Sequence, residues 1–160
     1  MTDLKSLIQS DLSDAMRAKD ETRKTALRML ISAIRNAEIP PAPEKETDVR
    51  IERTDLGDAA VIAVIQKQVK QRRDSIDQFR KASREDLASK EEAELVVLQH
   101  YLPVAPTTAE LEAVAARVIA ETGASGPKDM GKVMPRVAQE FAGRAEGRAI
   151  SEVVRRLLGG

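Results

Sequence analysis

Three charged residues lie where helical periodicity expects apolar side chains. Arg72 falls within the apolar stripe of one predicted helix, and Glu91 and Glu94 fall within the stripe of the next. A charge that faces a protein core costs several kcal/mol unless it is paired, so we expect a structural ion pair between Arg72 and these glutamates. A carboxylate metal site or an acid–base pair is the alternative. A di-iron site of helical bundles would need Glu-x-x-His motifs. This chain has none at Glu94, because position 97 is Val and His100 is six residues away.

Basic residues cluster in three segments. One set lies in the second predicted helix, one near the C-terminus, and one in residues 59–73, which hold Lys67, Lys70, Arg72 and Arg73 and no acidic residue. Such basic lines suit contact with a phosphate backbone without reading its sequence. Each line could equally be an ordinary solvated helix face. The candidate RNA-binding side chains are Lys24, Arg28, Arg35, Lys128, Lys132 and Arg136.

Two glycine-containing segments add candidate anion sites. Gly126 and Pro127 open a predicted helix whose first free backbone amides would face an anion beside Lys128. The segment 143–147 (GRAEG) predicts an exposed turn that offers Arg144 between Gly143 and Gly147. Both could also be ordinary helix boundaries. Neither matches a nucleotide-binding loop, so nucleotide hydrolysis is not predicted.

Composition excludes several classes of chemistry. The 160 residues contain no cysteine and one histidine, which rules out thiolate metal sites, disulfides and a cysteine nucleophile. Only Phe79, Tyr101 and Phe141 are aromatic, so base-stacking platforms are nearly absent. The net charge is zero, so a polyanion must be held by local patches. We therefore predict no catalytic residues, no metal and no cofactor. Without a signal segment or an apolar run of about 18 residues, we expect a cytoplasmic protein with no membrane contact.

The elements that must position these residues are all helices. Apolar residues recur every three to four positions, which predicts four antiparallel helices in residues 1–104 and three smaller helices in 105–160. The proline-rich and charged segment 40–54 is expected to be an exposed connector. Because the apolar stripes are used up internally, we expect a monomer.

Helix ends are predicted from capping residues. Asp20 should cap the second helix, Thr54 or Asp55 the third, Ser83 with Asp86 the fourth, and Thr107 with Glu110 the fifth. Gly123 should close the fifth helix, and Pro135 should kink or end the sixth.

Several short stretches, spread in order along nearly the whole chain, form a recognisable set. They are 25–30 (TALRML), 36–39 (NAEI), 70–75 (KQRRDS), 90–95 (KEEAEL), 101–103 (YLP), 129–134 (DMGKVM) and 143–147 (GRAEG). Together they resemble the GatB/YqeY family. The chain departs from the pattern of that family at Pro135 and in residues 40–48.

The resemblance implies a free-standing helical protein related to the tail of the GatB subunit of glutamine-dependent aminoacyl-tRNA amidotransferases. It implies contact with tRNA, with Lys132 and the turn at Gly143, Arg144 and Gly147 nearest the RNA. An aminoacyl-tRNA synthetase or an amidotransferase would be the protein partner. The leading hypothesis is thus a non-catalytic tRNA-binding accessory in aminoacylation or amidation. A helical protein–protein interaction module is the alternative. A stand-alone carbon–nitrogen ligase with glutamine as amido-N-donor is disfavoured, because the chain lacks a nucleophile and a phosphoryl site.

Overall fold

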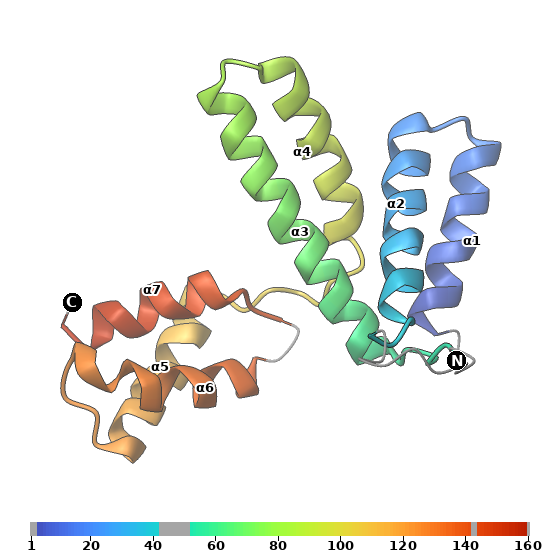
Figure 1. Ribbon diagram of the computed structural model, residues 1–160. Helices are drawn as coiled ribbons and strands as arrows, with labels where there is room; N and C mark the ends of the chain where they lie inside the picture. The colour runs from blue at the N-terminus through green and yellow to red at the C-terminus, as the bar shows by residue number, and fades with distance from the viewer. Residues whose placement is uncertain (1–2, 42–51, 142–143, 160) are drawn as a thin grey trace. The chain divides into compact units, whose positions relative to one another are not determined.

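The computed structural model describes residues 3–41, 52–141 and 144–159, and within them every regular element is helical (Figure 1). The fold is all-α, as predicted. Contacts between residues divide the chain into two units, Met1–Leu102 and Pro103–Gly160. The predicted connector at 40–54 falls mostly on residues 42–51, which lie outside the described residues.

The first unit contains two helical hairpins. Figure 1 shows α1 (Leu4–Arg17) running beside α2 (Glu21–Ala37), and α3 (Asp58–Lys81) running beside α4 (Glu85–Gln99). Their apolar stripes meet in one core, which buries residues from all four helices and the aromatic ring that follows α4. The core consists of Ile8, Ala15, Leu27, Leu30, Ile34, Val61, Ile65, Val69, Leu98 and Tyr101.

The second unit has its own core. It is built from α5 (Thr108–Thr122), the short 3₁₀ helix η1 (Pro127–Asp129), α6 (Met130–Glu140) and α7 (Gly147–Leu157). Its core residues are Leu111, Ala115, Val118, Val133, Val137, Phe141, Ile150, Val153, Val154 and Leu158.

Three predicted helix ends are present. Asp20 accepts a hydrogen bond from the Arg23 amide at the start of α2. Thr107 and Glu110 form the reciprocal capping box of α5, and Gly123 ends that helix with a left-handed φ of 67°. A glycine suits this position because residues with a Cβ adopt positive φ at a cost.

The caps predicted for α3 and α4 are wrong. The cap of α3 is Gly57, because Asp55 instead binds Lys5 at 2.7 Å. The cap of α4 is Arg84, whose guanidinium holds the Asp86 carboxylate at 2.9 and 3.0 Å and so removes it from the predicted capping role.

The sixth helix opens at Pro127, as predicted, but its first turn is a 3₁₀ helix. The segment after Gly126 first forms η1, and the α-helix proper begins at Met130. Pro135 lies inside α6 and does not end it. Proline removes only the hydrogen bond to the carbonyl of Gly131, while Val133 and Val137 are fully buried and hold the helix against the core.

Candidate nucleic-acid interface

The basic residues near the C-terminus lie on the solvent side of α6. Lys132 and Arg136 lie on successive turns, with 69% and 50% of their side chains exposed, and Lys128 is exposed on the preceding η1. Val133 and Val137 on the same helix are buried, so the amphipathic pattern of α6 turns the basic side chains outward. We call Lys128, Lys132 and Arg136 the α6 basic face.

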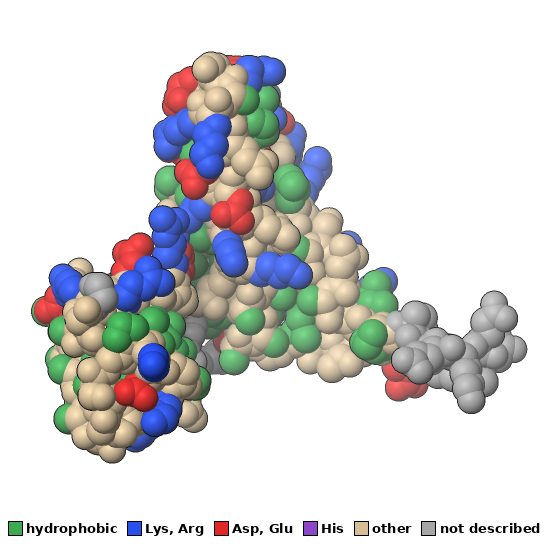
Figure 2. Space-filling model, turned by 60° about the vertical axis from the view of Figure 1, so that its left-hand side comes forward, with side chains coloured by type: hydrophobic (Ala, Val, Ile, Leu, Met, Phe, Trp, Pro, Cys, Tyr) green, Lys and Arg blue, Asp and Glu red, His purple; other side chains and the backbone are tan. Residues whose placement is uncertain are grey.

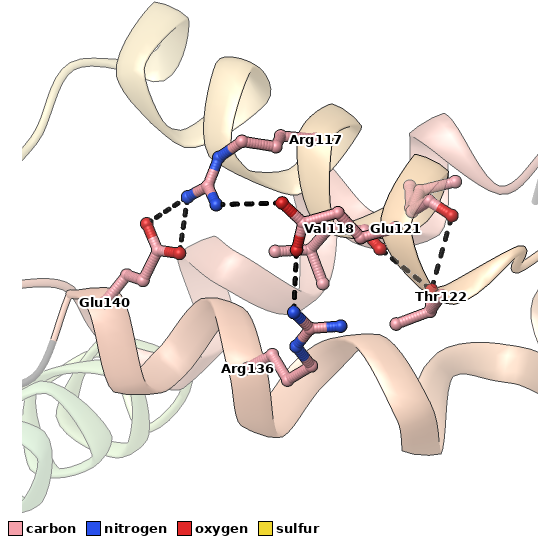
Figure 3. Close-up of polar contacts among 7 residues, drawn as sticks. Arg117, Val118, Glu121, Thr122, Arg136 and Glu140 are labelled. Carbon is pink, nitrogen blue, oxygen red and sulfur yellow. Dashed lines mark hydrogen bonds and ion pairs between the residues drawn. The ribbon is translucent and has the colours of Figure 1, made fainter.

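Carboxylates from α5 and α6 lie beside this face (Figure 3). Arg136 binds Glu121 at 2.6 Å, and Arg117 bridges Glu121, at 3.3 Å, to Glu140. Glu140 foremost, with help from Glu121, raises the pKa of Arg117. In the same close-up, Thr122 donates a hydrogen bond to the Val118 carbonyl at 2.8 Å, within the last turn of α5. Ion pairs this exposed are weak, so a phosphate can take the place of a carboxylate.

The Asp129 carboxylate lies next to the anion site predicted at Gly126 and Pro127. It accepts a hydrogen bond from the Ser125 amide at 3.0 Å and lies 3.4 Å from the Lys132 ammonium. The Ser125 amide, followed by Lys132, lowers the pKa of Asp129. Ser125 precedes the proline, so this hydrogen bond does not use the amides after Pro127, and the anion site stays a prediction.

The predicted turn before α7 is described only in part. Gly143 lies outside the described residues. Arg144 is exposed, and its amide donates to the Phe141 carbonyl at 2.8 Å. Gly147 is the first residue of α7 rather than a turn residue.

The three basic residues of α2 have different surroundings. Lys24 binds Glu21 at 2.6 Å, and the Arg28 guanidinium lies 4.0 Å from the Met16 sulfur. Arg35 instead lines a cavity of about 60 Å³ together with Lys5, Glu38 and Arg53 among others. Helical spacing places the three on one helix, but the structure does not give them a common partner.

Arg72 lies where the sequence places it, among apolar core residues. Its Nη1 is 2.8 Å from Glu91 Oε2 and 2.6 Å from Glu94 Oε2, and Arg72 and Glu94 are almost completely buried. Its Nη2 is 3.6 Å from the Met29 sulfur of α2. The cluster joins α2, α3 and α4, which makes it a structural element of the first unit. Among the described residues, no group of three or more His, Asp or Glu side chains could hold a metal ion.

A second polar contact across the first unit was not predicted. The buried Tyr101 hydroxyl donates a hydrogen bond to Asp11 of α1, and Arg23 of α2 lies 3.3 Å from the same carboxylate. Burial, followed by Asp11, raises the pKa of Tyr101 above its ordinary value of 10. A tyrosine just after a helix carries no spacing that names a partner 90 residues away, so sequence alone could not find this contact.

A groove between α2 and α3 was also missed. It measures about 340 Å³ and is lined by Arg28, Met29, Ser32, Ala33, Asn36 and Gln68. The sequence signal that could have pointed to this groove is the family resemblance. Its stretches 25–30 and 36–39 contain Arg28, Met29 and Asn36.

The face of the molecule drawn in Figure 2 carries mixed charge. Figure 2 shows basic and acidic side chains interspersed over the face in view, with exposed hydrophobic side chains between them. None of the described helices combines the length and the apolar character that crossing a membrane requires.

Sequence comparison finds fungal relatives that carry the name "Altered inheritance of mitochondria protein 41, mitochondrial". The protein of Pyrenophora tritici-repentis is 34% identical over 95% of this chain and 79% of its own length. That of Lachancea thermotolerans is 35% identical over 75% of this chain and 60% of its own length. That of Saccharomyces cerevisiae strain S288c is 36% identical over 67% of this chain, which spans about half (52%) of that relative.

The family described as "Yqey-like protein" matches residues 5–158, which takes in both helical units. This match, together with a relative 34% identical over nearly the whole sequence, shows that the chain belongs to the YqeY-like protein family.

Proposed function

We propose that this YqeY-like protein is a non-catalytic module that binds the phosphate backbone of tRNA through its second unit. The observation that carries the proposal is the α6 basic face, on which Lys128, Lys132 and Arg136 are exposed side by side along η1 and α6. Contacts to phosphate supply affinity and position without reading bases. They suit this protein because it has few aromatic residues on which bases could stack.

The local charge of residues 128–160 supports the proposal. This segment contains seven basic and four acidic residues in a chain whose net charge is zero. Lys132 and Arg136 pair with Asp129 and Glu121, and these exposed pairs are weak. Arg144 and, in the family resemblance, its neighbours Gly143 and Gly147 extend the proposed surface toward α7. Lys24, Arg28 and Arg35 remain a separate prediction.

The absence of a catalytic role is part of the proposal. Amide transfer from glutamine requires a nucleophile that releases ammonia and a site that activates the acceptor carboxylate. The sequence contains no cysteine and no nucleotide-binding loop. We therefore expect an amidotransferase or an aminoacyl-tRNA synthetase to act as the partner that performs chemistry on the bound tRNA.

The proposed tRNA binding also bears on the compartment in which the protein acts, and the buried apolar stripes bear on its oligomeric state. The protein must share a compartment with tRNA, which the cytoplasm and the mitochondrion both satisfy. The mitochondrial name belongs to the fungal relatives. A monomer is still expected, since each unit buries its own apolar stripes.

The experiment is a comparison of two charge-reversal variants in a tRNA-binding titration. Lys132→Glu with Arg136→Glu reverses two of the three charges of the α6 basic face, whereas Lys81→Glu with Lys90→Glu makes the same change in net charge at exposed positions of α3 and α4. We expect the α6 variant to bind total tRNA at least tenfold more weakly than the Lys81/Lys90 variant. Equal weakening by both variants would show a general charge effect and contradict the proposed surface.

A further inference from the structure

The groove between α2 and α3 combines an apolar floor with a polar rim. Met29 and Ala33 supply the floor, and about half (51%) of Met29 is exposed to solvent. Arg28, Ser32, Asn36 and Gln68 form the rim. The volume of about 340 Å³ lies at the lower end of the range for binding pockets, about 300–1,000 Å³.

The floor is held from below by the buried ion cluster. The Arg72 guanidinium lies 3.6 Å from the Met29 sulfur and is fixed by Glu91 and Glu94. The methionine side chain is flexible and polarisable, so it adapts to different apolar partners while its backbone stays in place on α2. A groove floor of this kind suits an apolar side chain from outside the chain.

The lining of the groove carries a cation, Arg28, and no acidic residue. Arg28 is exposed on the α2 wall, and Lys67 and Lys70, which flank Gln68 in the sequence, are exposed on α3. Other basic side chains of these two helices do not count toward the groove, because Arg23, Lys24 and Arg72 pair with carboxylates of their own. A lining with a cation and no acid favours an acidic partner.

We infer that the α2–α3 groove docks an acidic amphipathic helix of a partner protein. The apolar face of that helix would rest on Met29 and Ala33, with leucine-like residues at i, i+3, i+4 and i+7, and its carboxylates would meet Arg28, Lys67 and Lys70. An RNA backbone would meet the same charges but gain nothing from the apolar floor. This inference does not depend on the proposed tRNA contact, which lies in the other unit.

The test uses two synthetic helical peptides of about 15 residues, or four turns. One carries leucines at the stated spacing with glutamates elsewhere, and the other carries lysines in place of the glutamates. Binding to the full chain is followed by nuclear magnetic resonance of the methionine methyl groups. We expect the glutamate peptide to shift the Met29 signal saturably and to leave the Met130 and Met134 signals unchanged. We expect no binding of the lysine peptide.

Two variants and one control locate the contact. Met29→Asp should weaken binding of the glutamate peptide by about tenfold or more, because the central apolar contact of the groove is lost. Val96→Asp makes the same change at an exposed position on α4 (66% exposed) that does not line the groove, and should change binding less than twofold. Arg28→Glu combined with Lys67→Glu should weaken the glutamate peptide and create binding of the lysine peptide.

Three outcomes would overturn the inference. The first is a Met29 signal that the glutamate peptide does not shift, and the second is equal binding of the two peptides. The third is displacement of the glutamate peptide from Met29 by total tRNA, which would assign the groove to RNA. The α6 variant changes residues of the second unit, so we expect it to bind the glutamate peptide normally even if it loses tRNA binding. The tRNA proposal and the groove proposal are therefore tested by separate results.

Discussion

The Arg72 guanidinium lies 2.6 Å from the Glu94 carboxylate, and both side chains are more than nine-tenths buried between α3 and α4. Glu91, the second partner of Arg72, is about a quarter exposed, so Glu94 is the partner that solvent cannot replace. The pair supports Met29 on its far side and thereby connects the interior of the first unit to the groove on its surface.

Glu94→Ala should lower the free energy of unfolding of the first unit by about 3 kcal/mol. Breaking a buried pair costs about 3–5 kcal/mol because a charge is left in the core, and Glu91 still neutralises part of it. Guanidinium unfolding followed by tyrosine fluorescence measures the change, since Tyr101 is the one tyrosine and belongs to this unit. Glu92→Ala removes an exposed partner of Arg80 and serves as the control. Equal losses in the two variants would contradict the account.

Tyr101→Phe should destabilise the first unit by about 1–2 kcal/mol, because Asp11 loses a hydrogen bond across the core. The effect should depend on pH. Folding raises the pKa of this phenol above its ordinary value of 10, so the contribution is complete below pH 10. It is lost as pH rises further, because the unfolded chain ionises first.

Circular dichroism of both proteins under denaturant, from pH 8 upward, checks this dependence. The stability difference between the wild type and Tyr101→Phe should shrink above pH 10. A difference that stays constant over that range would show that Tyr101 ionises as freely in the folded state as in the unfolded state.

Asp129→Asn should strengthen tRNA binding by severalfold. The Asp129 carboxylate accepts a hydrogen bond from the Ser125 amide and lies beside Lys132, so an amide in its place would remove a negative charge from the α6 basic face. A filter-binding titration compares it with Asp86→Asn, which removes an exposed carboxylate from the start of α4 in the other unit. Weaker binding by Asp129→Asn would mean that this face does not meet phosphate.

Lys132→Ala should reduce the salt dependence of tRNA binding. Each lost phosphate contact lowers the slope of log K against log salt concentration by roughly 1 and weakens binding to all tRNAs alike. Titrations at several salt concentrations with two different tRNAs provide the measurement. An unchanged slope with lower affinity would indicate that Lys132 acts through the structure of α6 instead.

The spacing of residues along the chain predicted the features of the fold that depend on neighbouring residues within one helix. Apolar residues every three to four positions place Arg72 within a buried stripe, and the capping box at Thr107 follows from residues three apart. These features depend on neighbours along one helix, so they can be read without knowing how the helices pack.

Features that depend on distant partners could not be predicted. Asp55 is a good cap residue by type, but Lys5, 50 residues away, binds its carboxylate. The α2–α3 groove requires residues from two helices 30 or more positions apart, and no spacing within either helix reports it.

Electrophoretic titration of the purified chain with total tRNA at low and at physiological salt tests the central claim most directly. The account predicts saturable binding that weakens steeply as salt rises, together with no deamidation of glutamine by the protein alone. Failure to bind tRNA even at low salt, or release of ammonia from glutamine, would contradict it.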